Sequence, residues 1–163
     1  MLAEIKFHGV WTVEQKRGGK TILKREFKNA VTNIGKNNVL DVHFGAATQI
    51  TAWYLAFIDA SGFTALVNAD TMASHAGWTE FTGYTEGTRP LWTPGAAVSQ
   101  IVTNPASSDF SINAAGTLKG GFLTSVNVKA GATGTLWGTS LFTGDIPVTG
   151  GDTIKITYSV QAA

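Results

Sequence analysis

The chain has 163 residues, a length that suits one domain, since such a chain buries roughly 70% of its unfolded surface on folding. It contains no cysteine, which excludes disulfides, thiolate metal sites and a cysteine nucleophile, and it starts without the basic and apolar regions of a cleaved secretion signal. No apolar run approaches the roughly 18 residues of a membrane-spanning helix, so we expect no contact with membrane. Only 14% of the residues are charged, against about 25% in ordinary globular domains, and 19 are glycine, which favours β-structure with tight turns.

The net charge of +1 conceals an asymmetry along the chain. Residues 1–40 hold eight basic and three acidic side chains, giving +5, whereas residues 41–163 hold four basic and eight acidic ones, giving −4. One interpretation is an edge hairpin whose lysines discourage aggregation between sheets. Another is an electrostatic contact with an acidic partner. Nucleic acid fits less well, because aromatic residues do not alternate with the basic ones.

The N-terminal third predicts a hairpin. Apolar and polar residues alternate from Ala3 to Val13, as in a strand with one buried face, and a second such segment covers residues 21–27. The pair Gly18-Gly19 lies between them and allows the positive φ values of a tight turn. We therefore divide the single domain into a basic N-terminal hairpin or arm at 1–30 and a β-sandwich core at 31–163.

The centre of the chain predicts one helix and the main core strand. Residues 33–44 fit a short helix that Asn33 caps. The apolar run at 50–58 carries large side chains on both parities, which predicts a central strand with both faces covered. Residues 70–75 fit one helical turn capped by Asp70.

The remaining sequence predicts short strands. Residues 77–94 read as irregular strand and loop, limited to sheet edges by Pro90 and Pro94. Further β-like runs cover 97–102, 109–112, 121–128, 135–142 and 153–160, and the last of these alternates most regularly. Short strands separated by turn residues are typical of all-β folds. We expect an antiparallel β-sandwich or jelly-roll-like barrel with one or two short helices.

No motif in the sequence specifies a reaction. The three histidines, His8, His43 and His75, lack metal-ligand spacing, and the acidic residues are scattered or lie beside turn residues. The glycine pairs lack the spacing of phosphate-binding loops, and a GxSxG nucleophile is absent. We therefore predict no enzyme, and no catalytic, metal or cofactor-binding residues. A glycosidase would need carboxylates such as Glu80, Glu86 and Asp109 to converge in one cleft.

The five tryptophans divide into two groups. Trp11, Trp53 and Trp137 lie in regular strand patterns, so we expect them in the core. Trp78 and Trp92 flank the irregular segment, where exposed aromatic side chains would concentrate binding energy.

Several segments resemble small virion structural proteins of tailed bacteriophages. They are NIGKNNVLD (33–41), TAWYLAFID (51–59), DTMASHAGWTEF (70–81), TRPLW (88–92), GTLW (134–137) and the pair Gly151-Asp152. The resemblance implies a capsid cement or decoration protein, a class that commonly has β-sandwich, jelly-roll or β-tulip folds and forms oligomers on the shell. It carries no catalytic residues.

We therefore expect a decoration protein on the capsid surface of the virion, assembled in the cytoplasm of the bacterial host, that stabilises the shell. Its expected partners are the major capsid protein and further copies of itself, as a dimer or trimer, with no nucleic acid and no small-molecule substrate. The alternative is a tail or tail-fibre component that binds a receptor, with Trp78 and Trp92 stacking on host sugars. The predicted contact residues are Lys16, Arg17, Lys20, Lys24, Arg25, Trp78, Tyr84, Arg89 and Trp92.

Overall fold

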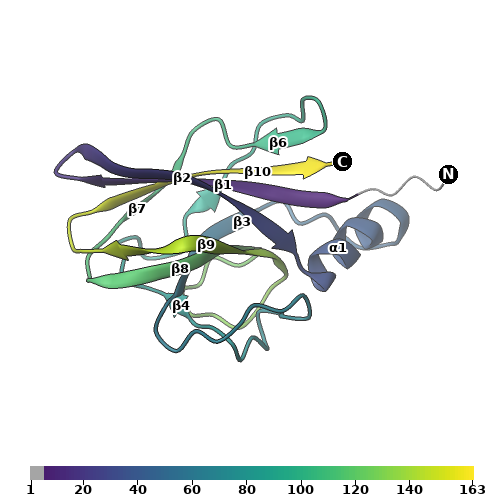
Figure 1. The fold of residues 1–163 in the computed structure, drawn as a ribbon. Helices are drawn as coiled ribbons and strands as arrows, with labels where there is room; N and C mark the ends of the chain where they lie inside the picture. The colour runs from purple at the N-terminus through teal and green to yellow at the C-terminus, as the bar shows by residue number, and fades with distance from the viewer. Residues whose placement is uncertain (1–5) are drawn as a thin grey trace.

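A computed structural model describes residues 6–163 and shows an antiparallel ten-stranded sheet with a short helix (Figure 1). The sequence of elements confirms the predicted all-β class. The elements are β1 (Phe7–Arg17), β2 (Lys20–Val31), α1 (Asn33–Phe44), β3 (Trp53–Asp59), β4 (Glu80–Phe81), β5 (Leu91–Trp92), β6 (Ile101–Thr103), β7 (Ser108–Ser111), β8 (Gly116–Thr124), β9 (Leu136–Val148) and β10 (Thr153–Ala162).

The sheet bends so that its two halves face each other. Its strand order is β4-β3-β8-β9-β2-β1-β10-β6, with β5 also paired to β3 and β7 to β10. Strand β2 joins the halves: most of its length pairs with β1, and only Ala30 and Val31 pair with β9. The sheet is not closed into a barrel. Side chains from both halves share one core cluster, which gives the sandwich-like arrangement. Figure 1 shows the tip of the β1–β2 hairpin at the end of the molecule opposite α1.

The main core fills the space between the halves. Trp11 of β1 is fully buried, and its ring lies so close to Gly121 of β8 that a Cβ there would be 2.7 Å from a ring carbon. The ring of Phe57 on β3 lies 4.3 Å from that of Phe110 on β7. Because the hairpin supplies Trp11 to this core, it is part of the folded sheet rather than a separate arm.

Strand β3 is covered on both faces, as predicted from residues 50–58. Leu55 and Phe57 point into the main core, whereas Ala56 and Ile58 belong to a smaller cluster on the other face. All four side chains are fully buried. The smaller cluster includes Trp78, which belongs to the irregular segment between β3 and β4.

The predicted N-terminal hairpin is also confirmed. Gly18 and Gly19 form the turn with φ values of 55° and 77°, in the left-handed region that glycine adopts readily. The strand predicted to begin at Ala3 is observed from Phe7, and residues 3–5 lie outside the described part of the chain. Among the described strands, only β1 pairs with residues 20–29 of β2, so this segment forms an edge of the sheet.

Two local predictions need correction. The helix spans the predicted residues, but its N-cap is Thr32, whose Oγ1 accepts a hydrogen bond from the Gly35 amide at 3.1 Å. Residues 70–75 form no helical turn; Thr71 and Ser74 form an antiparallel bridge instead. The Asp70 carboxylate accepts bonds from the amide of Val67 and from a tryptophan side chain, which holds a loop rather than a helix.

The later strands follow the predicted runs with shifted boundaries. Strand β9 continues through Gly144 and Pro147, where turn residues predicted an earlier end. Strand β10 reaches Ala162 and pairs with β1 over ten registered positions. Residues 77–94 contribute only the two-residue strands β4 and β5, both paired to β3, as expected for an irregular edge.

Candidate functional site

The five basic residues predicted as contacts surround the turn of the β1–β2 hairpin. Lys20, Lys24 and Arg25 are exposed on the edge segment of β2. Lys16 lies 3.7 Å from a Glu14 oxygen, and Arg17 is paired within the protein. The exposed charge at the tip therefore belongs mainly to β2.

Arg17 anchors the hairpin to the turn that precedes β10. Its Nε and Nη2 donate to the two carboxylate oxygens of Asp152 at 2.7 and 2.8 Å, and Gln15 Nε2 donates to the same carboxylate at 2.8 Å. The Thr149 amide adds a bond at 3.0 Å. The Arg17 guanidinium holds the pKa of Asp152 well below its ordinary value, because its hydrogen bonds favour the charged carboxylate. Sequence reasoning gave Asp152 a turn role and missed this pairing.

The other predicted contact residues lie inside the protein. The exposed fractions are 2% for Trp78, 1% for Tyr84, 1% for Arg89 and 7% for Trp92. The Trp78 indole donates to Asp70 at 3.0 Å, and the Trp92 indole donates to the Tyr158 carbonyl at 3.0 Å. The expectation that these side chains form an exposed contact surface is therefore wrong.

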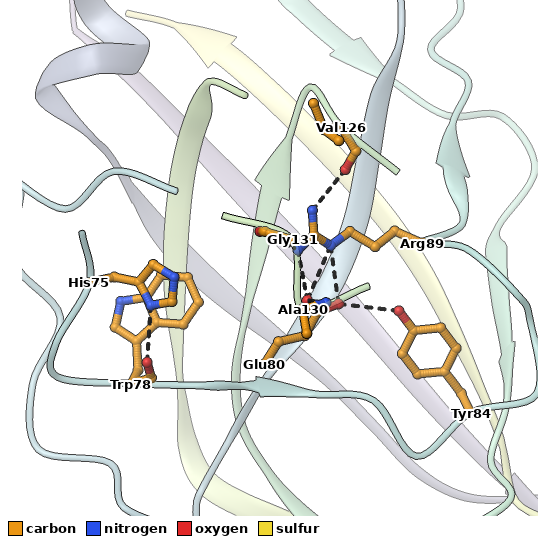
Figure 2. A network of polar contacts seen from close by, with 8 residues as sticks. All are labelled: His75, Trp78, Glu80, Tyr84, Arg89, Val126, Ala130 and Gly131. Carbon is orange, nitrogen blue, oxygen red and sulfur yellow. Dashed lines mark hydrogen bonds and ion pairs between the residues drawn. The ribbon is translucent and has the colours of Figure 1, made fainter. Parts of the chain in front are cut away.

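Arg89 instead forms a buried ion pair with Glu80 (Figure 2). Their side chains are 0% and 5% exposed, and Arg89 Nη2 lies 2.7 Å from Glu80 Oε2. Arg89 Nε donates to both carboxylate oxygens, at 3.1 and 3.2 Å. The remaining donors of Arg89 reach the carbonyls of Val126 at 2.8 Å and Gly131 at 3.2 Å. The pair thus connects the 77–94 segment to the loop after β8.

Glu80 accepts two further bonds in this network. The Ala130 amide donates to it at 2.7 Å, and the Tyr84 hydroxyl donates at 3.3 Å. Burial and the neighbouring Glu80 charge raise the pKa of Tyr84 well above its ordinary value. Figure 2 shows the Glu80 carboxylate at the centre of these donors. In the sequence Glu80 is one of several scattered acidic residues. The signal that could have revealed the pair is an Arg nine residues after a Glu in a segment with few other charges.

The arrangement is suited to holding loops together rather than to proton transfer. The Glu80 carboxylate already accepts from a guanidinium, an amide and a hydroxyl, which tie three segments of the chain together. Glu86 and Asp109 have other partners: Glu86 accepts from the Ser111 amide at 3.0 Å, and Asp109 contacts Ser107 and Lys155. Within residues 6–163, no group of three or more histidine or acidic side chains is placed to hold a metal ion.

An aromatic hollow of about 400 Å³ opens between α1 and the adjacent end of the sheet. Trp53, Trp92 and Trp137 line it, together with His43 and Asn38 of the helix. A hollow of this size with aromatic walls and a few polar groups is typical of small-ligand sites.

No family model matches this chain, and no curated protein does. None of the helical structure in the described residues has the length and hydropathy needed to cross a membrane.

Proposed function

We propose that this protein is a decoration, or cement, protein that binds the outside of a bacteriophage capsid shell and stabilises it. The observation that carries the proposal is the exposed basic edge of the β1–β2 hairpin. Its base is fixed in the core by Trp11, and its strand β2 presents Lys20, Lys24 and Arg25 to solvent. The resemblance to virion structural proteins supplies the setting.

A rigid basic hairpin suits attachment to an acidic surface. Charged side chains held on a folded strand lose less conformational freedom on binding than side chains on a disordered tail. Complementary charge also accelerates association and selects the correct partner. Repeated over many equivalent positions of a shell, individually weak contacts give strong overall attachment, and binding to the assembled shell stabilises it by mass action.

The first experiment measures binding of the purified protein to undecorated shells. Replacing Lys20 and Lys24 by Ala should weaken binding about tenfold at low salt, and the difference should shrink at high salt. The matched control replaces Lys119 and Lys129 by Ala, which removes the same charge from β8 and from the loop after it, segments that do not pair with the hairpin strands. Equal binding by both variants would contradict the role of the hairpin.

A second experiment tests stabilisation itself. Particles that carry the protein should retain DNA to a higher temperature than particles that lack it, because bound protein favours the assembled shell. Equal retention by both particles would refute the cement function, even if the protein binds shells.

The aromatic hollow favours a second candidate, a tail or tail-fibre component that binds a receptor. Trp53 lines the hollow and is only partly buried, so it is the tryptophan that a sugar could reach there, whereas Trp78 is buried elsewhere. This candidate predicts binding to host cells or to a glycan array that is lost in Trp53→Ala. A cement protein should bind shells and ignore cells.

A further inference from the structure

A groove lies between α1 and the end of β2 that joins it. Two adjoining hollows, of about 590 and 230 Å³, share Ala30 and Asn68 as lining residues and are here together called the α1–β2 groove. Its lining includes Lys28, Lys36, Leu40, Val67 and Leu141.

The groove gathers apolar side chains that the fold leaves in solvent. Leu40, Val67 and Leu141 line it and are 55%, 54% and 47% exposed. They come from the helix, from the segment after β3 and from β9, so the clustering is produced by the fold. The helix itself is lightly packed, with only Gly35 buried. Exposed apolar side chains gathered in adjoining hollows are a feature of interaction sites.

Within residues 6–163, the lining of the groove contains basic side chains and no acidic ones. His8, Lys28 and Lys36 line the two hollows together with the apolar side chains, and no described aspartate or glutamate lines either hollow. The groove is therefore complementary to an occupant that combines negative charge with apolar groups.

We propose that the α1–β2 groove binds an extended segment of a neighbouring polypeptide in which acidic and apolar residues alternate. In an extended segment successive side chains point in opposite directions, so one set packs on Leu40 and Leu141 while the other reaches the lysines at the rim. This goes beyond the hairpin contact, because Lys28 lies eight residues along β2 from Lys20, about 26 Å at the rise of a strand.

The test uses a short synthetic peptide that alternates Leu and Glu, added to the full-length protein. Methyl resonances of Leu40, Val67 and Leu141 should shift in NMR spectra on titration. Replacing Lys28 and Lys36 by Glu should weaken binding about tenfold or more, since each reversal places like charges together. The matched double reversal at Lys20 and Lys24 carries the same charge and should change the affinity less than about threefold.

Control peptides identify the occupant. A Leu–Lys peptide or an all-Glu peptide that binds as tightly as the Leu–Glu peptide would overturn the proposal, because the charge or the apolar contacts would then be irrelevant. Absence of binding up to about millimolar peptide would overturn it as well.

Two further outcomes would assign the groove to a different occupant and so overturn the proposal. One is binding to phosphatidylglycerol vesicles that is lost in the Lys28/Lys36 variant while the peptide has no effect. The other is peptide binding that becomes about tenfold tighter when residues 2–5 are deleted, which would show that the chain fills its own groove. Neither readout involves shells, so failure of this proposal and failure of the cement function are distinguishable.

Discussion

Breaking the Glu80–Arg89 pair should strongly destabilise the protein. Glu80→Leu would leave the Arg89 guanidinium buried without its carboxylate, and Arg89→Met would leave the Glu80 carboxylate buried without its guanidinium, since the Arg89 and Glu80 side chains are 0% and 5% exposed. Removing one partner of a buried pair costs about 3–5 kcal/mol. In a domain of this size that corresponds to a fall in Tm of roughly 6–20 °C.

The double variant makes the prediction specific. With both charges removed no buried ion remains, so the cost should come mainly from unpaired groups such as the Ala130 amide and the Val126 carbonyl, about 1–3 kcal/mol for each. The double variant should therefore be more stable than the sum of the single effects implies, by at least about 2 kcal/mol.

The assay is urea unfolding followed by tryptophan fluorescence, with the slope against urea checked for two-state behaviour. The control is Asp145→Asn, which breaks the exposed pair with Lys119 and should change stability by less than about 1 kcal/mol. Additive single effects, or single effects as small as that of the control, would refute the argument that the pair is a buried, coupled unit.

Three other predictions concern single sites. Asp152→Asn should be less stable than the wild type at neutral pH, and urea unfolding should show this difference shrinking as pH falls below about 4. The reason is that a carboxylate with a depressed pKa stabilises the fold fully above its ordinary pKa and loses that contribution as it takes up a proton at lower pH. Gly121→Ala should cost about 1–3 kcal/mol in the same assay because its Cβ would lie 2.7 Å from a buried tryptophan ring, whereas Gly87→Ala has open space and should cost much less. Burial raises the pKa of Tyr84 and of Tyr158, so ultraviolet titration should show both phenols protonated until alkali unfolds the protein; earlier ionisation of either would contradict their burial.

The pattern of neighbouring residues was sufficient to predict the turns and strands in which burial alternates regularly or glycine allows a tight turn. The turn at Gly18-Gly19 and the two-sided burial of β3 follow from glycine conformation and side-chain parity, both properties of adjacent residues. The alternation in β10 reflects one buried and one partly exposed face. Strand pairing, by contrast, depends on contacts between distant segments, which the sequence does not display.

The candidate contact residues show the same limit. The basic hairpin was found because charge and turn residues are local signals. Trp78 was assigned to the surface because its neighbours are irregular, yet an irregular segment can fold back over a sheet, and here it places the indole against Phe122 at a ring distance of 5.0 Å. The α1–β2 groove was not predicted, since its walls come from the helix, β2, β9 and a loop.

The pairing of β1 with β10 has a kinetic consequence. Phe7 is registered with Ala162, so one side of the first strand has no neighbour until nearly the whole described chain has been synthesised. The hairpin can form early, because its contacts are local, but closing so long a loop is slow. A nascent chain would thus expose Trp11 and an open strand edge for most of translation. The lysines of β2 would then protect the chain against self-association before they have any partner to bind.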